Sequence, residues 1–290
     1  MGKTVIAVLG GDKRMDFAAR ELVRHGYDVR EWGRSKDDDS FTFSKTAREW
    51  FSDVDALMLP LPSSFDGTHL WTPLCQGEEK LRMETLFSSA RHKVWLVGRF
   101  GESLRLRAQQ EGVQCIDYFD SEILQLKNAL PTAEGAIEIA MRELPVVLDG
   151  TKVAVIGYGR IGEVLSSKLK LLGSNVTVYA RRREACTRAE LMGYSSKQII
   201  GENVLHFDTN TRVIFNTVPK RLISRDVLQM LPHECLIIDL ASAPGGVDTI
   251  AAAELGIHFV WATALPGKCA PESAGVILGQ TVHSILLDTK

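Results

Sequence analysis

Two glycine-rich turns, each between an apolar strand pattern and an amphipathic helix pattern, predict an α/β protein with two doubly wound parallel-sheet (Rossmann-like) domains. The first turn is at Gly10 and Gly11, and the second is the G-x-G-x-x-G run from Gly157 to Gly162. After each turn, short apolar strands alternate with helical patterns, as in open parallel sheets. A length of 290 residues suffices for two domains, which we expect to be joined by an interdomain helix.

Residues 1–130 are expected to form the first domain, which would carry substrate contacts. It opens with the apolar strand TVIAVL, followed by the Gly10–Gly11 turn and an amphipathic helix. Further buried strands are predicted over residues 27–32, 56–62, 93–98 and 113–118. These strands and the helices between them predict an open parallel sheet.

Residues 131–150 are predicted to form the interdomain helix and a linker. Pro131 and Thr132 suit the start of a helix, because the fixed φ of proline matches the first turn and its missing N–H is not needed there. Small and apolar residues then follow at helical spacing over 133–144.

Residues 151–272 are expected to form the cofactor domain, with strands at VAVIGYG, NVTVYA, VIFNTV, CLIIDLA and HFVWAT. The stretch ALPGKCAP over 264–271 has the composition of a turn that lines the ligand-facing edge. Residues 273–290 are apolar at helical spacing and have no strand left to pair with. We expect this helix to pack back on the first domain.

The composition argues for a small-molecule ligand. A formal net charge of −2 provides no basic field for nucleic acid, and no apolar run is long enough to cross a bilayer. The N-terminal sequence is typical of a buried strand and not of a cleavable signal, so we expect a cytoplasmic protein. Five scattered cysteines without a CxxC pair predict reduced thiols and no metal site.

The G-x-G-x-x-G run predicts a dinucleotide site, with a separate role for each glycine. Gly157 closes the turn, Gly159 lets the pyrophosphate approach the backbone, and Gly162 lets the helix pack close to the strand. The phosphates would lie at the helix N-terminus, so Tyr158, Arg160 and Ile161 are cofactor-loop residues as well. The alternative is a tight strand-to-helix turn without a ligand.

The next strand, NVTVYA, predicts that the cofactor is NADP. A dinucleotide domain for NAD normally ends this strand on an acid that binds the ribose, whereas here Ala180 is followed by Arg181 and Arg182. Nothing would repel a 2′-phosphate, and the arginines could form charge-assisted hydrogen bonds with it. The alternative is that the arginines only begin a solvated helix.

Polar residues after two later strands are further cofactor candidates, because the carboxyl ends of parallel strands face the ligand. Asn216, Thr217 and Val218 follow one strand, and Asp239 and Ala241 follow the next. Capping of a turn is the alternative for Thr217.

Substrate contacts are predicted for Arg14, Thr132, Ser242 and Gly267, which lie at turns or at the expected helix start facing the gap between the domains. Glu134, near the same helix start, is a candidate general base. Alternatively, Arg14 pairs with a neighbouring acid on the surface, Ser242 caps a turn, and Glu134 is a helix-end charge favoured by the dipole.

The two-domain layout resembles the D-2-hydroxyacid dehydrogenases, but the arginine and the acid–base histidine of that family have no counterpart in IIDLASAPGG or ALPGKCAP. His258 and His283 fall on a strand entry and in the last helix, where core or surface roles are expected.

A more specific resemblance is carried by GGDKR, LPLP, NALPTAEGAIEIAM, GYGRIG, the Ala180–Arg181 pair, DLASAPGG and LPGKCAPESAG. In combination these motifs resemble the A-subunit family of the dipicolinate synthases and cover most of the chain outside residues 63–113. The resemblance implies oxidation of dihydrodipicolinate to dipicolinate with a nicotinamide cofactor, in the mother cell of a sporulating bacterium. It also implies that the partner is the flavoprotein-like B subunit of dipicolinate synthase, and it is compatible with a homo-oligomer.

The family would account for the missing histidine, because aromatising a dihydropyridine is downhill and needs alignment more than a strong base. Two alternatives stay open: an NADP-dependent dehydrogenase of another small carboxylate, and a non-catalytic NADP-sensing subunit.

Overall fold

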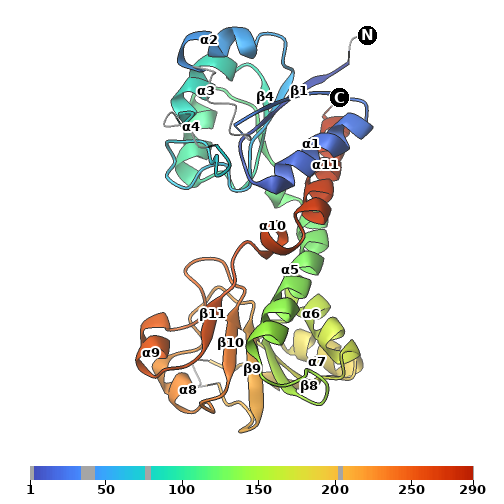
Figure 1. Cartoon of the computed structure of the whole chain (residues 1–290), viewed down its shortest axis with the longest axis vertical. Coiled ribbons are helices and arrows are strands. Elements are labelled where there is room, and N and C mark those ends of the chain that lie inside the picture. The colour runs from blue at the N-terminus through green and yellow to red at the C-terminus, as the bar shows by residue number, and fades with distance from the viewer. Residues whose placement is uncertain (1–2, 34–42, 76–79, 202–204, 290) are drawn as a thin grey trace. The chain divides into compact units, whose positions relative to one another are not determined.

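The computed structural model describes residues 3–33, 43–75, 80–201 and 205–289 (Figure 1). The chain forms two compact units. One comprises Met1–Lys127 together with Ala270–Lys290, and the other comprises Asn128–Cys269. Each unit contains one parallel sheet with helices on its faces, which confirms the predicted fold class.

The first unit contains a five-stranded parallel sheet in the order β2-β1-β3-β4-β5. Its strands are β1 Val5–Leu9, β2 Asp28–Trp32, β3 Ala56–Met58, β4 Val94–Val97 and β5 Cys115–Asp117. The inner strands are apolar on both faces: Ile6 and Val8 face one core, while Ala7 and Leu9 face the other. The strand order reverses at β1, between β2 and β3, so the ligand-facing point of this sheet is expected beside the Gly10–Gly11 turn.

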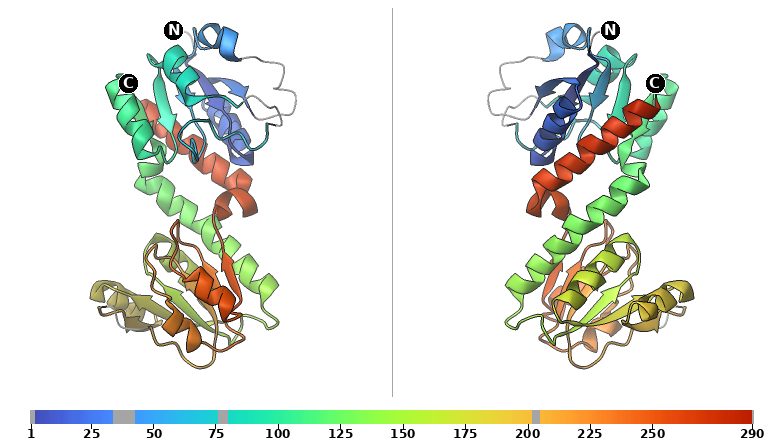
Figure 2. Two further views of the ribbon diagram at one scale, coloured as in Figure 1. Left: turned by 90° about the vertical axis from the view of Figure 1, so that its left-hand side faces the viewer. Right: turned by 90° about the vertical axis from the view of Figure 1, so that its right-hand side faces the viewer.

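Helices of the described residues pack around this sheet. They are α1 Lys13–Arg24, α2 Phe43–Trp50, α3 Met83–Ala90, α4 Glu102–Gln110, the 3-10 helix η2 Tyr118–Asp120 and the C-terminal α11 Pro271–Asp288. The helix expected over residues 273–290 is α11, and it lies beside α1 (Figure 2). A Cβ on Gly275 would lie 2.3 Å from the Arg14 carbonyl oxygen, so glycine permits this close packing of the two helices.

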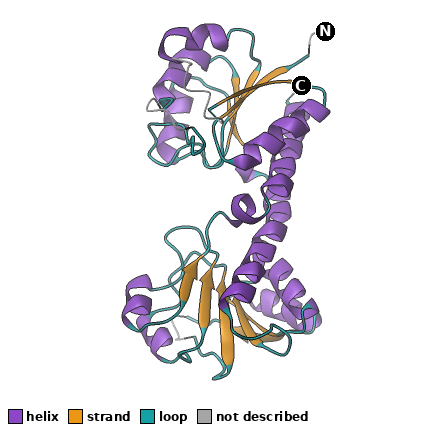
Figure 3. Ribbon diagram, in the orientation of Figure 1, coloured by secondary structure: helices purple, strands orange, loops and turns teal. Residues whose placement is uncertain are grey.

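The second unit contains a six-stranded parallel sheet in the order β11-β10-β9-β6-β7-β8 (Figure 3). Its strands are β6 Lys152–Ile156, β7 Asn175–Ala180, β8 Ser195–Gln198, β9 Thr211–Asn216, β10 Leu236–Asp239 and β11 Phe259–Trp261. Its helices include α6 Arg160–Leu171, α7 Arg183–Leu191, α8 Arg225–Gln229, α9 Thr249–Glu254 and α10 Leu265–Cys269. The strand order reverses at β6, which carries the second glycine-rich turn at its carboxyl end.

The sequence prediction omitted β8, whose sequence SSKQ has no apolar residue. The strand forms because its backbone pairs with β7 at the edge of the sheet, and because buried Tyr194 and Ile199 anchor its two ends. An edge strand with one paired side does not need a buried face.

The predicted start of the interdomain helix is wrong. Helix α5 spans Glu122–Glu143, so Pro131 lies in its interior and Thr132 and Glu134 lie in the middle of the helix. Proline removes one helical hydrogen bond, and the Thr132 hydroxyl donates to the Asn128 carbonyl oxygen at 2.7 Å near the same turn. Burial of Leu124 and Ala129 holds the preceding turns in the helix.

Residues 264–271 also differ from the prediction, because Leu265–Cys269 forms the short helix α10 instead of an open turn. Gly267 therefore lies within a helix. Over the described ranges of the chain, no helix has the length and hydropathy needed to cross a membrane.

Candidate functional site

The turn between β6 and α6 has the geometry of a dinucleotide-binding loop. Gly157 has φ = +95°, and a Cβ there would lie 2.2 Å from Thr217 Oγ1. A Cβ on Gly162 would lie 2.0 Å from the Gly157 carbonyl oxygen. With any residue other than glycine at this position, α6 could not begin as close to the strand as it does. By contrast, apart from its chain neighbours, no described residue has a heavy atom within 4 Å of a Cβ built on Gly159, the N-cap of α6. Two glycines close the turn, and the third leaves room for a phosphate at the helix N-terminus.

The other residues of this loop contribute differently. Tyr158 is buried, and its ring packs edge-on against Tyr194, with the Arg188 guanidinium 5.8 Å from its centroid. Burial raises the pKa of the Tyr158 phenol. Its side chain therefore belongs to the core, which leaves its backbone for a cofactor, while Arg160 and Ile161 form the first turn of α6.

Strand β7 ends on an uncharged residue, and two positively charged residues follow it directly. Ala180 is buried, whereas Arg181 and Arg182 are exposed, and Arg182 is the N-cap of α7. Within the part of the chain that the structure describes, neither guanidinium contacts a carboxylate. Both arginines therefore fit an anionic group next to the ribose position.

Asn216 and Asp239 form a buried pair at the carboxyl ends of the adjacent strands β9 and β10. Asn216 Nδ2 donates to Asp239 Oδ1 at 2.7 Å and to the Val218 carbonyl oxygen at 3.0 Å. Asp239 also accepts the backbone N–H groups of Ala241, at 3.0 Å, and Gly246, at 2.7 Å. We call Asn216 and Asp239 the strand-end clamp.

Asn216 and Asp239 are both cofactor candidates at the strand ends, and in the structure their side chains make contacts within the protein. Their polar atoms are occupied within the protein, and both residues are at most 1% exposed. What the clamp determines is the path of the loop from Ala241 to Gly246, which carries the exposed Ser242. Thr217 likewise uses its hydroxyl to donate to the Ile156 carbonyl oxygen at 2.9 Å, and Val218 packs beside Gly157.

Arg14 pairs with the neighbouring acid Asp12, as in the alternative from the sequence, but Arg14 is buried and does not lie on the surface. Its Nε donates to Asp12 Oδ1 at 2.8 Å, and Nη2 donates to the Leu61 carbonyl oxygen at 2.6 Å. The neighbouring Gly11 amide donates to the Trp71 carbonyl oxygen at 2.8 Å, so this N–H group of the glycine turn is already hydrogen-bonded within the protein. Nη1 is left without a partner among the described residues.

The remaining substrate and base candidates all lie in the second unit. Glu134, in the middle of α5 and not at its start, is exposed and forms an ion pair with Lys168 of α6 at 2.9 Å. Thr132 lies two residues earlier on the same helix, and Gly267 lies within α10.

His258 lies at the surface, where its half-exposed ring has Nε2 3.4 Å from Glu143 Oε2. His283 has packing contacts, and a third histidine, His69, was missed by sequence reasoning. His283 stacks on His25 with ring centroids 3.8 Å apart and contacts Tyr27, and burial together with His25 lowers the pKa of His283. His69, in the loop after β3, has its Nδ1 2.9 Å from the Asp66 carboxylate. Such a contact orients an imidazole and leaves its Nε2 free for proton transfer. The D-x-x-H spacing was the available sequence signal.

Comparisons with known proteins agree with this geometry. Residues 132–250 match the family model for the D-isomer specific 2-hydroxyacid dehydrogenase, NAD binding domain. With the glycine turn at β6, this match defines the second unit as a nicotinamide-dinucleotide-binding domain of the dehydrogenase type. Residues 5–119 match the family model for the N-terminal domain of the dipicolinate synthase A subunit.

Relatives over the whole length identify the family. The chain is 30% identical to the dipicolinate synthase A subunit of Bacillus subtilis (strain 168) over 288 residues, which are 98% of this chain and 96% of that protein. The chain therefore belongs to the A-subunit family of the dipicolinate synthases, which confirms the resemblance seen in its motifs.

Two solved structures of this family have the same fold. The dipicolinate synthase A subunit from Bacillus halodurans superposes with a TM-score of 0.85 at 26% identity, over 98% of this chain and 99% of that one. The corresponding protein from Bacillus subtilis gives a TM-score of 0.85 at 28% identity, over 99% and 97%.

Proposed function

We propose that the chain oxidises dihydrodipicolinate to dipicolinate as the A subunit of a dipicolinate synthase. The observation that carries this proposal is the β6–α6 glycine turn, open at Gly159, in a chain that matches a relative of the family over 98% of its length. The substrate loses a hydride and a proton and becomes an aromatic ring, and NADP, when bound, is the hydride acceptor. The reaction is downhill and requires alignment of the substrate more than strong acid–base catalysis.

NADP as the cofactor is supported by the end of β7. Gly157, Gly159 and Gly162 would hold the pyrophosphate at the N-terminus of α6, while Arg181 and Arg182 would hold the 2′-phosphate. The buried Ala180 presents no carboxylate that would repel this phosphate.

Replacing Arg181 with alanine should therefore reduce the preference for NADP over NAD. Charge-assisted pairing of this kind contributes about 1–3 kcal/mol, or roughly 5- to 150-fold in affinity. Fluorescence titration of both cofactors measures it, and Arg183→Ala, in the first turn of α7, is the matched control. Equal affinities for NADP and NAD in the unchanged protein would refute the assignment.

The dicarboxylate substrate is proposed to bind some of Arg14, Thr132, Ser242 and Gly267. Two observations support this proposal. Arg14 has its Nη1 available for a carboxylate, and Ser242 is exposed on the loop whose path the strand-end clamp determines. Each of these residues would offer a guanidinium, hydroxyl or backbone donor to a carboxylate oxygen.

Glu134 is the proposed acceptor of the proton that the ring loses, with water as the alternative acceptor. Glu134→Gln should lower the rate of NADPH formation about 100-fold, whereas His258→Gln and His283→Gln should stay within about tenfold of the unchanged protein. Lys168→Gln is the control, because it breaks the ion pair and keeps the carboxylate.

Equal losses in Glu134→Gln and Lys168→Gln would show that only the ion pair matters. A 100-fold loss in a histidine variant that still binds NADP, including His69→Gln, would contradict the mechanism without histidine. Turnover by the isolated chain would in turn exclude a role limited to sensing NADP.

The family also supports a partner and a place for the reaction. The flavoprotein-like B subunit would complete the enzyme, in the cytoplasm of the mother cell of a sporulating bacterium. Assembly of several copies of this chain into a homo-oligomer is compatible with the proposal.

A further inference from the structure

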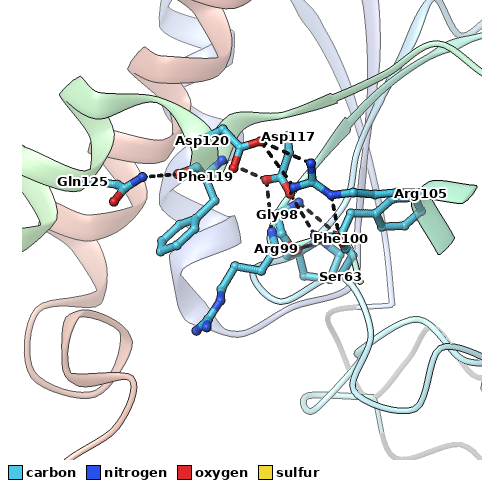
Figure 4. A network of polar contacts seen from close by, with 10 residues as sticks. Ser63, Gly98, Arg99, Phe100, Arg105, Asp117, Phe119, Asp120 and Gln125 are labelled. Atoms are coloured by element: carbon cyan, nitrogen blue, oxygen red, sulfur yellow. Dashed lines mark hydrogen bonds and ion pairs between the residues drawn. The ribbon is translucent and has the colours of Figure 1, made fainter. Parts of the chain in front are cut away.

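In the first unit, a buried carboxylate accepts hydrogen bonds from two backbone N–H groups just after the carboxyl end of β4. Asp117, at the end of β5, accepts the N–H groups of Arg99 at 3.1 Å and Phe100 at 2.9 Å (Figure 4). Successive N–H groups at such a turn form an anion-binding concavity, and here the anion is part of the protein. A ligand carboxylate at this strand end therefore cannot use these amides.

The carboxylate is fixed from the other side by Arg105. Arg105 Nη2 lies 2.5 Å from Asp117 Oδ2 and 3.3 Å from Asp120 Oδ2. Arg105 Nε donates to the Phe100 carbonyl oxygen at 2.9 Å. The two acids and Arg105 thus form a closed network (Figure 4). Neither acid needs Arg99 as a counter-ion.

Arg99 has a left-handed backbone, with φ = +47°. This conformation is strained for a residue other than glycine, and such strain is typical of functional sites, where the surrounding structure holds it. The hydrogen bond from its own N–H to Asp117 is one of the contacts that hold it.

The Arg99 side chain points away from Asp117 and Asp120 (Figure 4). Its guanidinium lies 5.4 Å from the centroid of the Phe119 ring, and it contacts no carboxylate in the described ranges of the chain. A guanidinium supported on an aromatic face keeps its planar fork of N–H donors available for a carboxylate.

Arg99 also lies at the ligand-facing edge of its sheet, because only Gly98 separates it from the end of β4. Two hydrogen bonds tie this strand end to the loop after β3: Ser63 N–H donates to the Gly98 carbonyl oxygen at 2.8 Å, and Gly98 N–H donates to Ser63 Oγ at 3.0 Å. These hydrogen bonds hold the strand end beneath Arg99 against the loop after β3.

We propose that the Arg99 guanidinium binds one of the two carboxylates of the pyridine-type dicarboxylate. This inference rests on the proposed function. It adds Arg99 to the proposed substrate contacts, from residues 63–113, where the motifs gave no such contact. The ligand is a planar ring with a carboxylate in its plane, and the planar guanidinium fork matches that carboxylate in a bidentate manner.

Calorimetric titration of the full chain saturated with NADP tests the proposal with two probes, dipicolinate and the monocarboxylate picolinate. The unchanged protein should bind dipicolinate at least about tenfold more tightly. Arg99→Gln should weaken dipicolinate binding about 10- to 100-fold and bring the two affinities together, while NADP affinity stays unchanged.

Two further variants separate binding from folding. Arg99→Gly relieves the left-handed strain, so it should be at least as stable to heat as the unchanged protein and still lose the preference for dipicolinate. Arg107→Gln is the matched control, because Arg107 lies over the Phe87 ring in the same unit but is paired with Glu111. It should leave both affinities within about twofold.

An unchanged preference for dipicolinate in both Arg99 variants would overturn the subsite and leave the proposed function intact. Failure of the unchanged protein to bind dipicolinate would overturn both.

Discussion

Gly159→Ala is expected to weaken NADP binding about 100-fold without lowering the stability of the protein. The space around a Cβ at this position is open in the structure, and Gly159 has φ = −109°, which alanine adopts. The added methyl group would meet only the pyrophosphate, and overpacking of this kind costs about 1–3 kcal/mol. Fluorescence titration with NADP and thermal unfolding of the same samples measure the two effects.

Two other glycine variants make this result specific. Gly101→Ala is the matched control, because Gly101 is the N-cap of α4, has an ordinary φ and is equally open. Gly101→Ala should change neither the affinity for NADP nor the thermal stability. Gly162→Ala should instead destabilise the second unit, because its Cβ would lie 2.0 Å from the Gly157 carbonyl oxygen. NADP affinity retained within about threefold in Gly159→Ala would place the cofactor elsewhere.

The largest loss of stability is expected from Asp239→Ala. Removal of this carboxylate leaves three buried N–H donors unpaired, on Asn216, Ala241 and Gly246. Each unpaired donor costs about 1–3 kcal/mol, so the free energy of unfolding should fall by about 3 kcal/mol or more. Urea unfolding monitored by circular dichroism measures it.

A control for Asp239→Ala is available in the same unit. Asp248 caps α9 by accepting the Ala251 N–H at 3.1 Å, so Asp248→Ala removes one bond and should cost about 1 kcal/mol. Asn216→Asp tests the other half of the clamp, since it would place two carboxylates in contact and should also destabilise the unit. If Asp239→Ala and Asp248→Ala cost the same, the clamp does not hold the loop.

Features with local causes could be predicted from the sequence. The roles of Gly157, Gly159 and Gly162 follow from backbone sterics within one turn, and buried parallel strands are recognisable as apolar runs. The fold class and the family motifs follow from the same kind of evidence.

Features that depend on distant neighbours could not be predicted in the same way. Proline is favoured at the first position of a helix, but here burial of the preceding turns keeps Pro131 inside α5. Asn216 and Asp239 were recognised as strand-end residues, yet their contact exists only because β9 and β10 are neighbours in the sheet. The enclosure of Asp117 by Arg105 and the amides after β4 likewise depends on the pairing of β4 with β5.

The discontinuity of the first unit has a consequence for biosynthesis. On α1, Met15 and Leu22 bury their side chains against Leu278 and Val282 of α11, which the ribosome adds only after the whole second unit. The intervening segment, Asn128–Cys269, takes roughly 7–28 s to translate at typical rates. During that interval the second unit can fold as a continuous stretch of chain, while the apolar face of α1 stays open to chaperones or to aggregation.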